Sequence, residues 1–324
     1  MSKALIVGID DYPENKLRCC VNDATALANT IDTNGDGSPN FDVILETNIQ
    51  EKGRLLGLIE KLFEGNTDTA LFYFSGHGYV DKLGGYIVTP DYSEHDWGIS
   101  MNDILKIAND SKIRNKIIIL DCCHSGAIGQ IKSGSRSNGE SIIAEGVSIL
   151  TSSLASEVSM EVNGHGVFTN LLLEALKGGA ANINGKITPS SIYAYIDQAL
   201  GEWDQRPIFK TNVKEFNAIK SIEPQVPISI IRNLTKYFKT PQDEFDLDPS
   251  YEYTNTNNIE HKVVEPYAKE ENVVVFKELQ KMASVGLIVP VDEEHMYFAA
   301  MNSKSCRLTA LGYHYWNLVN KKQI

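Results

Sequence analysis

The chain has 324 residues, of which 42% are hydrophobic and 22% charged, and its formal net charge is −12. This length and apolar content are enough for one large domain with a substantial core and a small second domain. The negative charge disfavours broad binding to nucleic acid or anionic membranes, because attraction to phosphate depends on clustered Lys and Arg.

Neither a membrane span nor a secretory signal is predicted. No run of eighteen apolar residues occurs, and the first segment, MSKALIVGIDDYP, has two acidic residues where a signal peptide needs a long apolar stretch. We therefore expect a cytoplasmic globular protein without membrane contact. The five cysteines include two adjacent pairs, Cys19 with Cys20 and Cys122 with Cys123, and no C-x-x-C. This spacing is not that of a disulfide framework, so we expect reduced thiols.

Short apolar runs alternate with segments of helical periodicity over the first two hundred residues. Strands are predicted at 4–9, 41–45, 69–74, 116–120 and 147–151, and helices at 23–31, 51–63, 101–108, 168–176 and 189–200. Strands that are apolar on both faces and separated by helices indicate a mainly parallel sheet between two helix layers. In such folds the carboxyl ends of the strands lie along one edge, where ligands and chemistry collect.

Three regions are predicted along the chain. Residues 1–222 form the large α/β domain, 223–272 a helix and an extended acidic linker or wrapping arm, and 273–324 a small α+β module. The last region has the order helix, short strand, turn, strand and helix, which is similar to the second half of a winged-helix domain. From 222 to 324 there are eleven Lys and Arg against fourteen Asp and Glu. This balance disfavours DNA binding and favours a regulatory or partner-binding module.

Two motifs follow predicted strands. SGHG (75–78) comes after ALFYF, and DCCHSG (121–126) comes after IIIL. A cysteine nucleophile needs a neighbouring base, an oxyanion site and partial exposure. His77 can supply the base, and its flanking glycines let a backbone N–H, which we assign to Gly78, approach an oxyanion. Adjacent residues of a strand point to opposite sides, so Cys122 and Cys123 cannot both face His77.

FYFSGHG together with DCCHSG resembles the caspase clan of cysteine peptidases, and most closely the metacaspases and bacterial orthocaspases. The resemblance implies a caspase-like three-layer αβα sandwich. It makes Cys123 the nucleophile, with His77 lying 46 residues earlier, and it gives Cys122 the variable position and His124 a structural one. The implied reaction is peptide acyl transfer, with the backbone N–H groups of Gly78 and Cys123 stabilising the oxyanion.

The resemblance extends to CCVNDA near the start of the chain. In metacaspases the matching positions line the primary specificity pocket, and here they are Cys20, Asp23, Ser75 and Asp121. Two carboxylates in one pocket repel each other when it is empty, and a guanidinium or ammonium group relieves the repulsion. We therefore expect substrates with Arg or Lys before the scissile bond, and not Asp, which would meet like charge.

Regulatory features are expected on both sides of the linker. Residues 130–141 are polar, rich in Gly and Ser, and expected to be exposed, so Lys132 and Arg136 are candidate sites of self-cleavage. Bacterial caspase-like proteases often carry appended regions that keep them inactive until a signal arrives, in antiviral defence or programmed death. By that analogy, Lys304 and Arg307 would contact an anionic small molecule, or the C-terminal module would bind an activating protein.

Other enzymatic or metal-binding functions fit the motifs less well. Position 129 is glycine, which excludes the loop of a tyrosine phosphatase. Adjacent cysteines make poor tetrahedral ligands, so a zinc site with His77 and His124 is disfavoured. The remaining alternatives are a caspase-fold signalling or scaffold protein with little protease activity, and a sensor that acts chiefly through its C-terminal module. The intact pair of His77 and Cys123 favours the peptidase.

The sequence also contains a possible calcium loop and a second Gly-His-Gly sequence. DTNGDGSPNFD (32–42) has Asp32, Asn34 and Asp36 at the spacing of calcium ligands. Position twelve would be Val43, and a strand follows, so a turn that ends a helix is favoured. Many metacaspases need calcium, so calcium dependence stays open, and no other metal or cofactor is expected. His165, in NGHG, is interpreted as a loop residue.

Overall fold

The computed structural model describes residues 2–122, 143–152, 161–162, 164–200, 207–256 and 263–324. The chain divides into two compact units, residues 1–223 and 224–324. None of the helices in these described segments is both long enough and apolar enough to cross a membrane.

The N-terminal unit is built on a six-stranded sheet in the order β12-β8-β7-β3-β1-β2. Neighbouring strands are parallel except for β12, which runs antiparallel to β8 at one edge. The strands are β1 (Ser2–Gly8), β2 (Phe41–Thr47), β3 (Thr69–Ser75), β7 (Asn115–Asp121), β8 (Val147–Thr151) and β12 (Ile208–Asn212). The mainly parallel sheet predicted from the apolar runs is confirmed, and the antiparallel edge strand is an addition to it.

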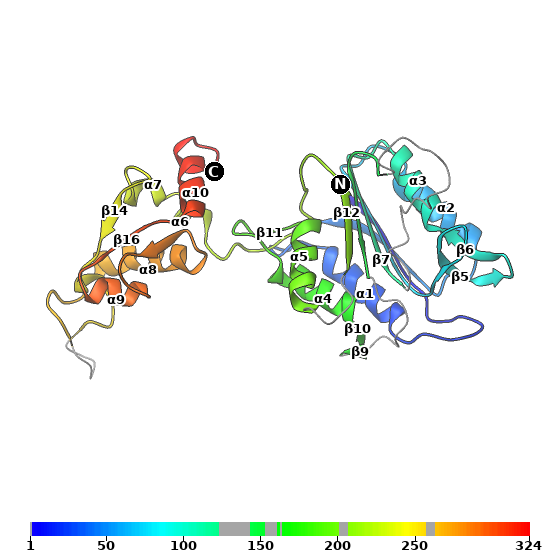
Figure 1. Cartoon of the computed structure of the whole chain (residues 1–324), viewed down its shortest axis with the longest axis horizontal. Helices are drawn as coiled ribbons and strands as arrows, with labels where there is room; N and C mark the ends of the chain where they lie inside the picture. Colours follow the sequence, from blue (N-terminus) through cyan, green and yellow to red (C-terminus); the bar gives the residue numbers. More distant parts are fainter. Residues whose placement is uncertain (1, 123–142, 153–160, 163, 201–206, 257–262) are drawn as a thin grey trace. The chain divides into compact units, whose positions relative to one another are not determined.

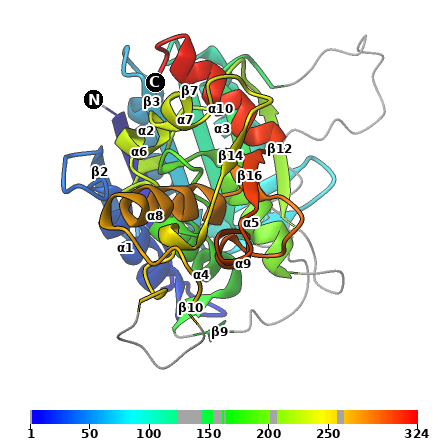
Figure 2. The ribbon, with the colours of Figure 1, turned by 90° about the vertical axis from the view of Figure 1, so that its left-hand side faces the viewer.

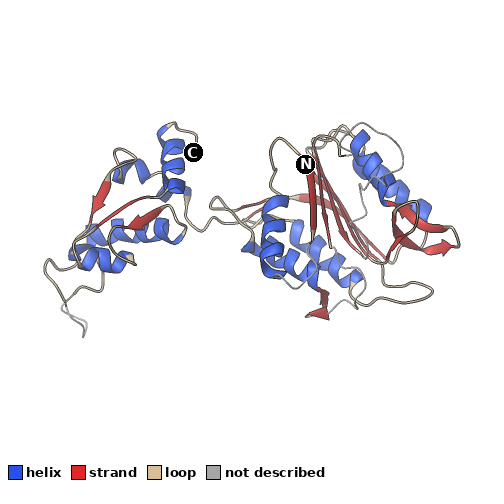
Figure 3. Cartoon of the chain, in the orientation of Figure 1, coloured by secondary structure: helices blue, strands red, loops and turns tan. Residues whose placement is uncertain are grey.

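Helices cover both faces of this sheet (Figure 1, Figure 3). One face carries α2 (Lys52–Phe63) and α3 (Met101–Asp110), and the other carries α1 (Cys20–Ile31), α4 (Val167–Glu174) and α5 (Pro189–Leu200). A π-helical turn, η2 (Ala175–Gly179), continues α4. Alternation along the strands produces the two layers, because Phe72 and Phe74 join the core beside α2 and α3, whereas Leu71 and Tyr73 join the core beside α1 and α4. The predicted three-layer arrangement is therefore confirmed.

Three small antiparallel sheets complete the described part of this unit. They are β4 (Gly78–Val80) with β5 (Gly85–Ser93) and β6 (Asp96–Ser100), β9 (Glu161–Val162) with β10 (His165–Gly166), and β11 (Lys186–Ile187) with β13 (Lys220–Ser221). The first begins directly after His77. The backbone N–H of Val88 donates to the carbonyl oxygen of His77 at 2.9 Å, so this sheet fixes the backbone at the histidine.

The C-terminal unit folds around a three-stranded antiparallel sheet in the order β14-β16-β15. Figure 2 shows α8, α9 and α10 around this sheet. The elements are α6 (Ile228–Ile231), α7 (Leu234–Tyr237), β14 (Glu244–Asp246), a 3-10 turn η3 (Pro249–Tyr251), α8 (Glu270–Ser284), β15 (Ile288–Pro290), α9 (Met296–Met301), β16 (Ser305–Leu308) and α10 (Ala310–Asn320). A helix, α9, stands where a turn was predicted. The similarity to a winged-helix domain stays a prediction.

The region predicted as an extended acidic linker belongs to this folded unit. Its strand β14 pairs with β16, placing Phe245 opposite Cys306, and Phe245 packs edge-on against Phe238 and Tyr251. The buried amide of Asn255 donates to three backbone carbonyl groups. Its order comes from aromatic contacts and from hydrogen bonds between side chain and backbone, which leave no periodic pattern in the sequence.

Candidate functional site

The carboxyl ends of β3 and β7 lie side by side at one edge of the main sheet. Ser75, the last residue of β3, is the register partner of Asp121, the last residue of β7. The motifs SGHG and DCCHSG begin at these two residues. The backbone N–H of Gly76 donates to the carbonyl oxygen of Asp121 at 3.4 Å, which links the two strand ends. The parallel sheet thus brings together the first residues of two motifs that are separated by more than forty residues.

Three of the predicted site residues lie outside the described residues: Cys123, Lys132 and Arg136. Cys122 is described, and it is only 5% exposed. It belongs to the core that also contains Tyr12. Burial of this kind is typical of a structural cysteine that packs as a small apolar residue.

His77 is held by Asn15 and Tyr12. Its ring Nε2 lies 2.6 Å from the carbonyl oxygen of Asn15, and its backbone N–H donates to the Tyr12 hydroxyl at 3.0 Å. The two rings pack with centroids 4.5 Å apart. Because a carbonyl oxygen can only accept, Nε2 carries the proton, and Nδ1 of the neutral ring is the nitrogen that can accept one. This tautomer is suited to a general base.

The contacts of His77 were not predicted from the sequence. Asn15 has φ 56°, in the left-handed region that Asn tolerates, and it lies in the turn DYPENKL. Pro and Asn do indicate a turn there. The partner of that turn cannot be read from the same signal, since the contact joins residues 62 positions apart.

Gly76 is required by the close packing beneath His77. A Cβ at this position would lie 2.6 Å from the Tyr12 hydroxyl oxygen and 2.7 Å from Cζ of Phe74. We expect Gly76→Ala to displace Tyr12, to destabilise the unit by about 1–3 kcal/mol and to lower kcat. The control is Gly57→Ala, on the exposed side of α2 with no atom within 4 Å of its Cβ, which should gain about 0.5–1 kcal/mol. Equal effects of both substitutions on melting and on kcat would contradict this packing.

Helix α1 carries Cys20 and Asp23 to the same edge of the sheet. The carboxylate of Asp10 accepts the backbone N–H groups of Cys20 and Val21 at 2.9 and 3.2 Å, which caps the helix. The thiol of Cys20 is hydrogen-bonded to Ser75. The four residues predicted to line the specificity pocket, Cys20, Asp23, Ser75 and Asp121, are therefore close together.

Asp23 and Asp121 form an acidic cluster together with His165 and Thr169. The Oδ2 atoms of both carboxylates lie near the position that a Cβ on Gly166 would occupy, at 3.4 Å for Asp23 and 3.7 Å for Asp121. Thr169 donates to Asp121 Oδ2 at 2.6 Å. The glycine therefore leaves open the space beside both carboxylates.

His165 is the clearest correction to the sequence interpretation. It was expected to be a loop residue, but it lies in β10, and its ring Nδ1 is 2.7 Å from Asp23 Oδ1. Thr169, two residues into α4, was not predicted either. The repeated Gly-His-Gly sequence was the available signal for His165, but sequence alone does not show that β10 approaches α1.

Burial of the two carboxylates governs their protonation. It raises the pKa of Asp23 to about 7, with repulsion from Asp121 adding to the effect and hydrogen bonds from His165 and Gly166 opposing it. Burial also raises the pKa of Asp121, against hydrogen bonds from Thr169 and Ser152. Removing carboxylates from water disfavours their charged form. A cation placed between them would restore both charges.

The thiol of Cys20 is poorly suited to act as a nucleophile. Burial raises its pKa well above the usual range, and the charges of Asp10, Asp121 and Asp23 add to the effect, although the hydrogen bond to Ser75 opposes it. Only the thiolate attacks a carbonyl group, so a thiol held protonated is inert. Cys20 can therefore line the site without competing in the reaction.

The raised pKa of Asp23 predicts a pH dependence of stability. The folded-state pKa of about 7 lies above the roughly 3.9 of an unfolded Asp, so the folded state binds more protons between these values and loses stability as the pH rises through them. Asp23→Asn should remove this loss of stability at high pH. Its melting temperature relative to wild type should rise by several degrees from pH 5 to pH 8. Asp42→Asn, which removes an exposed carboxylate on β2, should give a constant difference, and a constant difference for Asp23→Asn would contradict the prediction.

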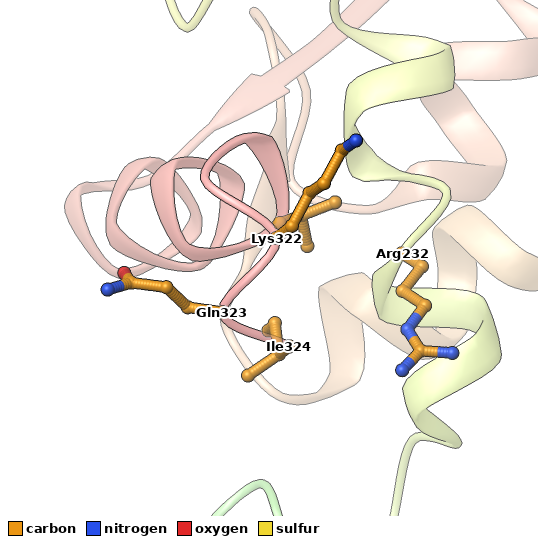
Figure 4. A pocket seen from close by; sticks show the side chains of 5 residues that line it. Arg232, Lys322, Gln323 and Ile324 are labelled. Carbon is orange, nitrogen blue, oxygen red and sulfur yellow. The ribbon is translucent and has the colours of Figure 1, made fainter.

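The predicted signal-binding residues of the C-terminal unit do not line the surface pocket at the end of α10. Lys304 and Arg307 are exposed on and beside β16. The pocket is lined by Arg232, Val319, Lys322, Gln323 and Ile324 at the end of α10. In Figure 4 the Arg232 guanidinium and the Lys322 amine extend in different directions. They do not converge on one point as an anion site would require.

The acidic turn after α1 does not fit calcium. Asp36 Oδ1 accepts both the backbone N–H and the hydroxyl of Ser38, at 2.9 and 2.6 Å, and Asn34 Oδ1 accepts the N–H of Ser221 at 3.0 Å. These oxygen atoms stabilise the turn itself. In the part of the chain that the structure describes, no group of three or more His, Cys, Asp or Glu side chains is arranged to hold a metal ion.

Comparison with known proteins identifies a family. Residues 1–238 match the family model described as caspase domain. No curated protein matches the chain. The matched range contains the strand ends of β3 and β7, His77 and the acidic cluster.

Proposed function

The chain belongs to the caspase-domain family, and on this premise we propose that it is a cytoplasmic cysteine endopeptidase of the metacaspase or orthocaspase type that cleaves after Arg or Lys. Family membership indicates a cysteine peptidase that acts on proteins. The basic specificity, the catalytic residues and the regulation are parts of the proposal.

The acidic cluster is the observation that carries the proposed specificity. Asp23 has a side chain that is 3% exposed, and its carboxylate is near that of Asp121. Holding two carboxylates close together out of water costs free energy, and a bound cation offsets this cost. An Arg guanidinium can bond both carboxylates through its several N–H groups. An Asp side chain at the same place would add a third negative charge.

The proposed reaction divides the work between His77 and Cys123. His77 Nδ1 takes the thiol proton, and the Cys123 thiolate attacks the carbonyl carbon of the scissile bond. The backbone N–H groups of Gly78 and Cys123 stabilise the oxyanion, and His77 gives its proton to the leaving amine. The thioester is then hydrolysed by a water molecule that His77 activates. The carbonyl of Asn15 keeps Nδ1 available throughout, because it holds the other ring nitrogen as a donor.

A peptide series that differs only in the residue before the scissile bond tests the proposal. We expect cleavage after Arg and Lys, and cleavage after Asp that is slower by about a thousandfold or more, equivalent to several kcal/mol. Cleavage of none of the peptides by the chain, alone or with cell extract, would favour the caspase-fold scaffold. Preferred cleavage after Asp would refute the basic specificity.

We further propose that self-cleavage and the C-terminal unit regulate the enzyme in defence or cell death. Lys132 and Arg136 follow the cysteine motif in a polar segment, and they have the proposed specificity. Intact mass spectrometry of the wild type and of Cys123→Ala tests self-cleavage. Only the wild type should be converted into two smaller fragments. An anionic small molecule or a protein that binds residues 224–324 is the proposed activator.

A further inference from the structure

A second histidine is part of the acidic cluster. His165 lies in β10, whose register partner is Val162 of β9. Its side chain is 18% exposed, and its ring Nδ1 lies 2.7 Å from Asp23 Oδ1. The other oxygen of this carboxylate, Oδ2, accepts the backbone N–H of Gly166 at 3.3 Å. Two consecutive residues of β10 therefore bind both oxygens of Asp23.

We propose that His165 is a positioning residue for substrate specificity: its ring holds the Asp23 carboxylate in place to receive the basic side chain of the substrate. This inference rests on the proposed function, because it assumes that the acidic cluster is the site for Arg or Lys. It extends that function by assigning a task to a residue outside the two catalytic motifs.

The bonding pattern supports positioning instead of direct substrate contact. His165 Nδ1 donates to Asp23, because a carboxylate can only accept. Gly166, next in the chain, has an N–H for Asp23 and no side chain beside Asp121. The carboxylate of Asp23 is therefore oriented from the β10 side. A carboxylate with both oxygens bonded is fixed before the substrate arrives, which lowers the entropy lost on binding.

The same contact favours the charged form of Asp23. Among the described residues, the other titratable groups that interact with Asp23 are Cys20 on α1, Tyr73 on β3 and Asp121 on β7, and each of them is negatively charged when deprotonated. His165 is the only neighbour among the described residues whose interaction lowers the pKa of Asp23 by both a hydrogen bond and its charge. Without the His165 ring, Asp23 would be protonated to a higher pH and would bind a cation less well.

Two substitutions separate positioning from simple packing. His165→Leu removes the donor, whereas His165→Asn keeps an N–H donor two bonds from Cβ, as in the histidine ring. For an Arg peptide at pH 7, His165→Leu should raise KM about fivefold to tenfold, which corresponds to a rise of about one unit in the pKa of Asp23, with kcat nearly unchanged. The KM defect should disappear by pH 9, where Asp23 is ionised in both chains. His165→Asn should behave more like wild type than like His165→Leu, because it keeps the hydrogen bond to Asp23 and lacks only the charge of the ring.

A binding measurement that needs no catalysis completes the test. The sample is the Cys123→Ala chain with 15N-labelled histidine, in which the ring resonance of His165 is identified by its loss in His165→Asn. Agmatine, which carries a guanidinium group, should shift this resonance. When His165→Leu is added, the affinity of agmatine should begin to fall at a higher pH, between pH 9 and pH 7. The positioning role would be overturned if agmatine bound without shifting this resonance, or if its affinity were the same with and without His165 at every pH. Neither result would contradict the proposed basic specificity. Absence of both agmatine binding and cleavage after Arg would overturn the proposed specificity itself, and the positioning role with it.

Discussion

Cys123→Ala should lower kcat/KM for an Arg peptide by roughly ten-thousandfold or more, because removing a covalent nucleophile abolishes the catalysed path. Cys122→Ala should retain nearly all activity. The two substitutions remove the same atom from adjacent residues, so each is a control for the other. Measured side by side, they assign the reactive thiol of DCCHSG.

The two variants should also differ in stability. Cys122 is buried in the core of the unit, so Cys122→Ala should lower the free energy of unfolding by about 1 kcal/mol and the melting temperature by roughly 2–4 °C. Circular dichroism detects this change. Loss of hydrolysis in Cys122→Ala with a normal melting temperature, together with an active Cys123→Ala, would reverse the assignment.

Asp121→Asn should lower kcat/KM for Arg peptides by about a hundredfold to a thousandfold, mainly through KM. Removing one partner of a buried charge pair costs about 2–5 kcal/mol, and Asp121 shares its site with Asp23, so half of the negative charge remains. Asp23→Asn should have an effect of similar size. Steady-state kinetics with Arg and Lys peptides measures both.

The variants at the acidic cluster need a charge control and a stability control. Asp42→Asn removes one negative charge from the exposed surface of β2, and it should leave the kinetics unchanged. The Asp121 variant should fold and melt no lower than wild type above pH 7, because the substitution also removes the repulsion between two buried carboxylates. A variant that is well folded yet still cleaves Arg peptides normally would contradict the role of Asp121.

Much of the N-terminal fold could be predicted because its strands carry strong local signals. The run IIIL before DCCHSG is apolar on both faces, and a run of this kind is typical of a central parallel strand. Since parallel strands end at one edge, the pairing of Ser75 with Asp121 follows from the fold class. The antiparallel strand β12 is half exposed, and its sequence IFKTN gives a much weaker signal.

The contacts that shape the site were harder to predict, since they join distant parts of the chain. Asn15 meets His77 through a backbone carbonyl, which every residue has, so its identity says nothing about the contact. His165 lies 142 positions from Asp23, and its flanking glycines resemble an ordinary turn. The sequence motifs predict the reacting groups, whereas the contacts of His77 with Asn15 and of Asp23 with His165 are visible only in three dimensions.

Labelling with an irreversible peptidyl ketone that carries Arg before its reactive group tests both the nucleophile and the specificity at once. Peptide mapping by mass spectrometry should find one adduct, on Cys123, formed much faster than with the matching Asp reagent and slowed by Asp121→Asn. An adduct on Cys122 or Cys20, or faster labelling by the Asp reagent, would contradict the proposed enzyme.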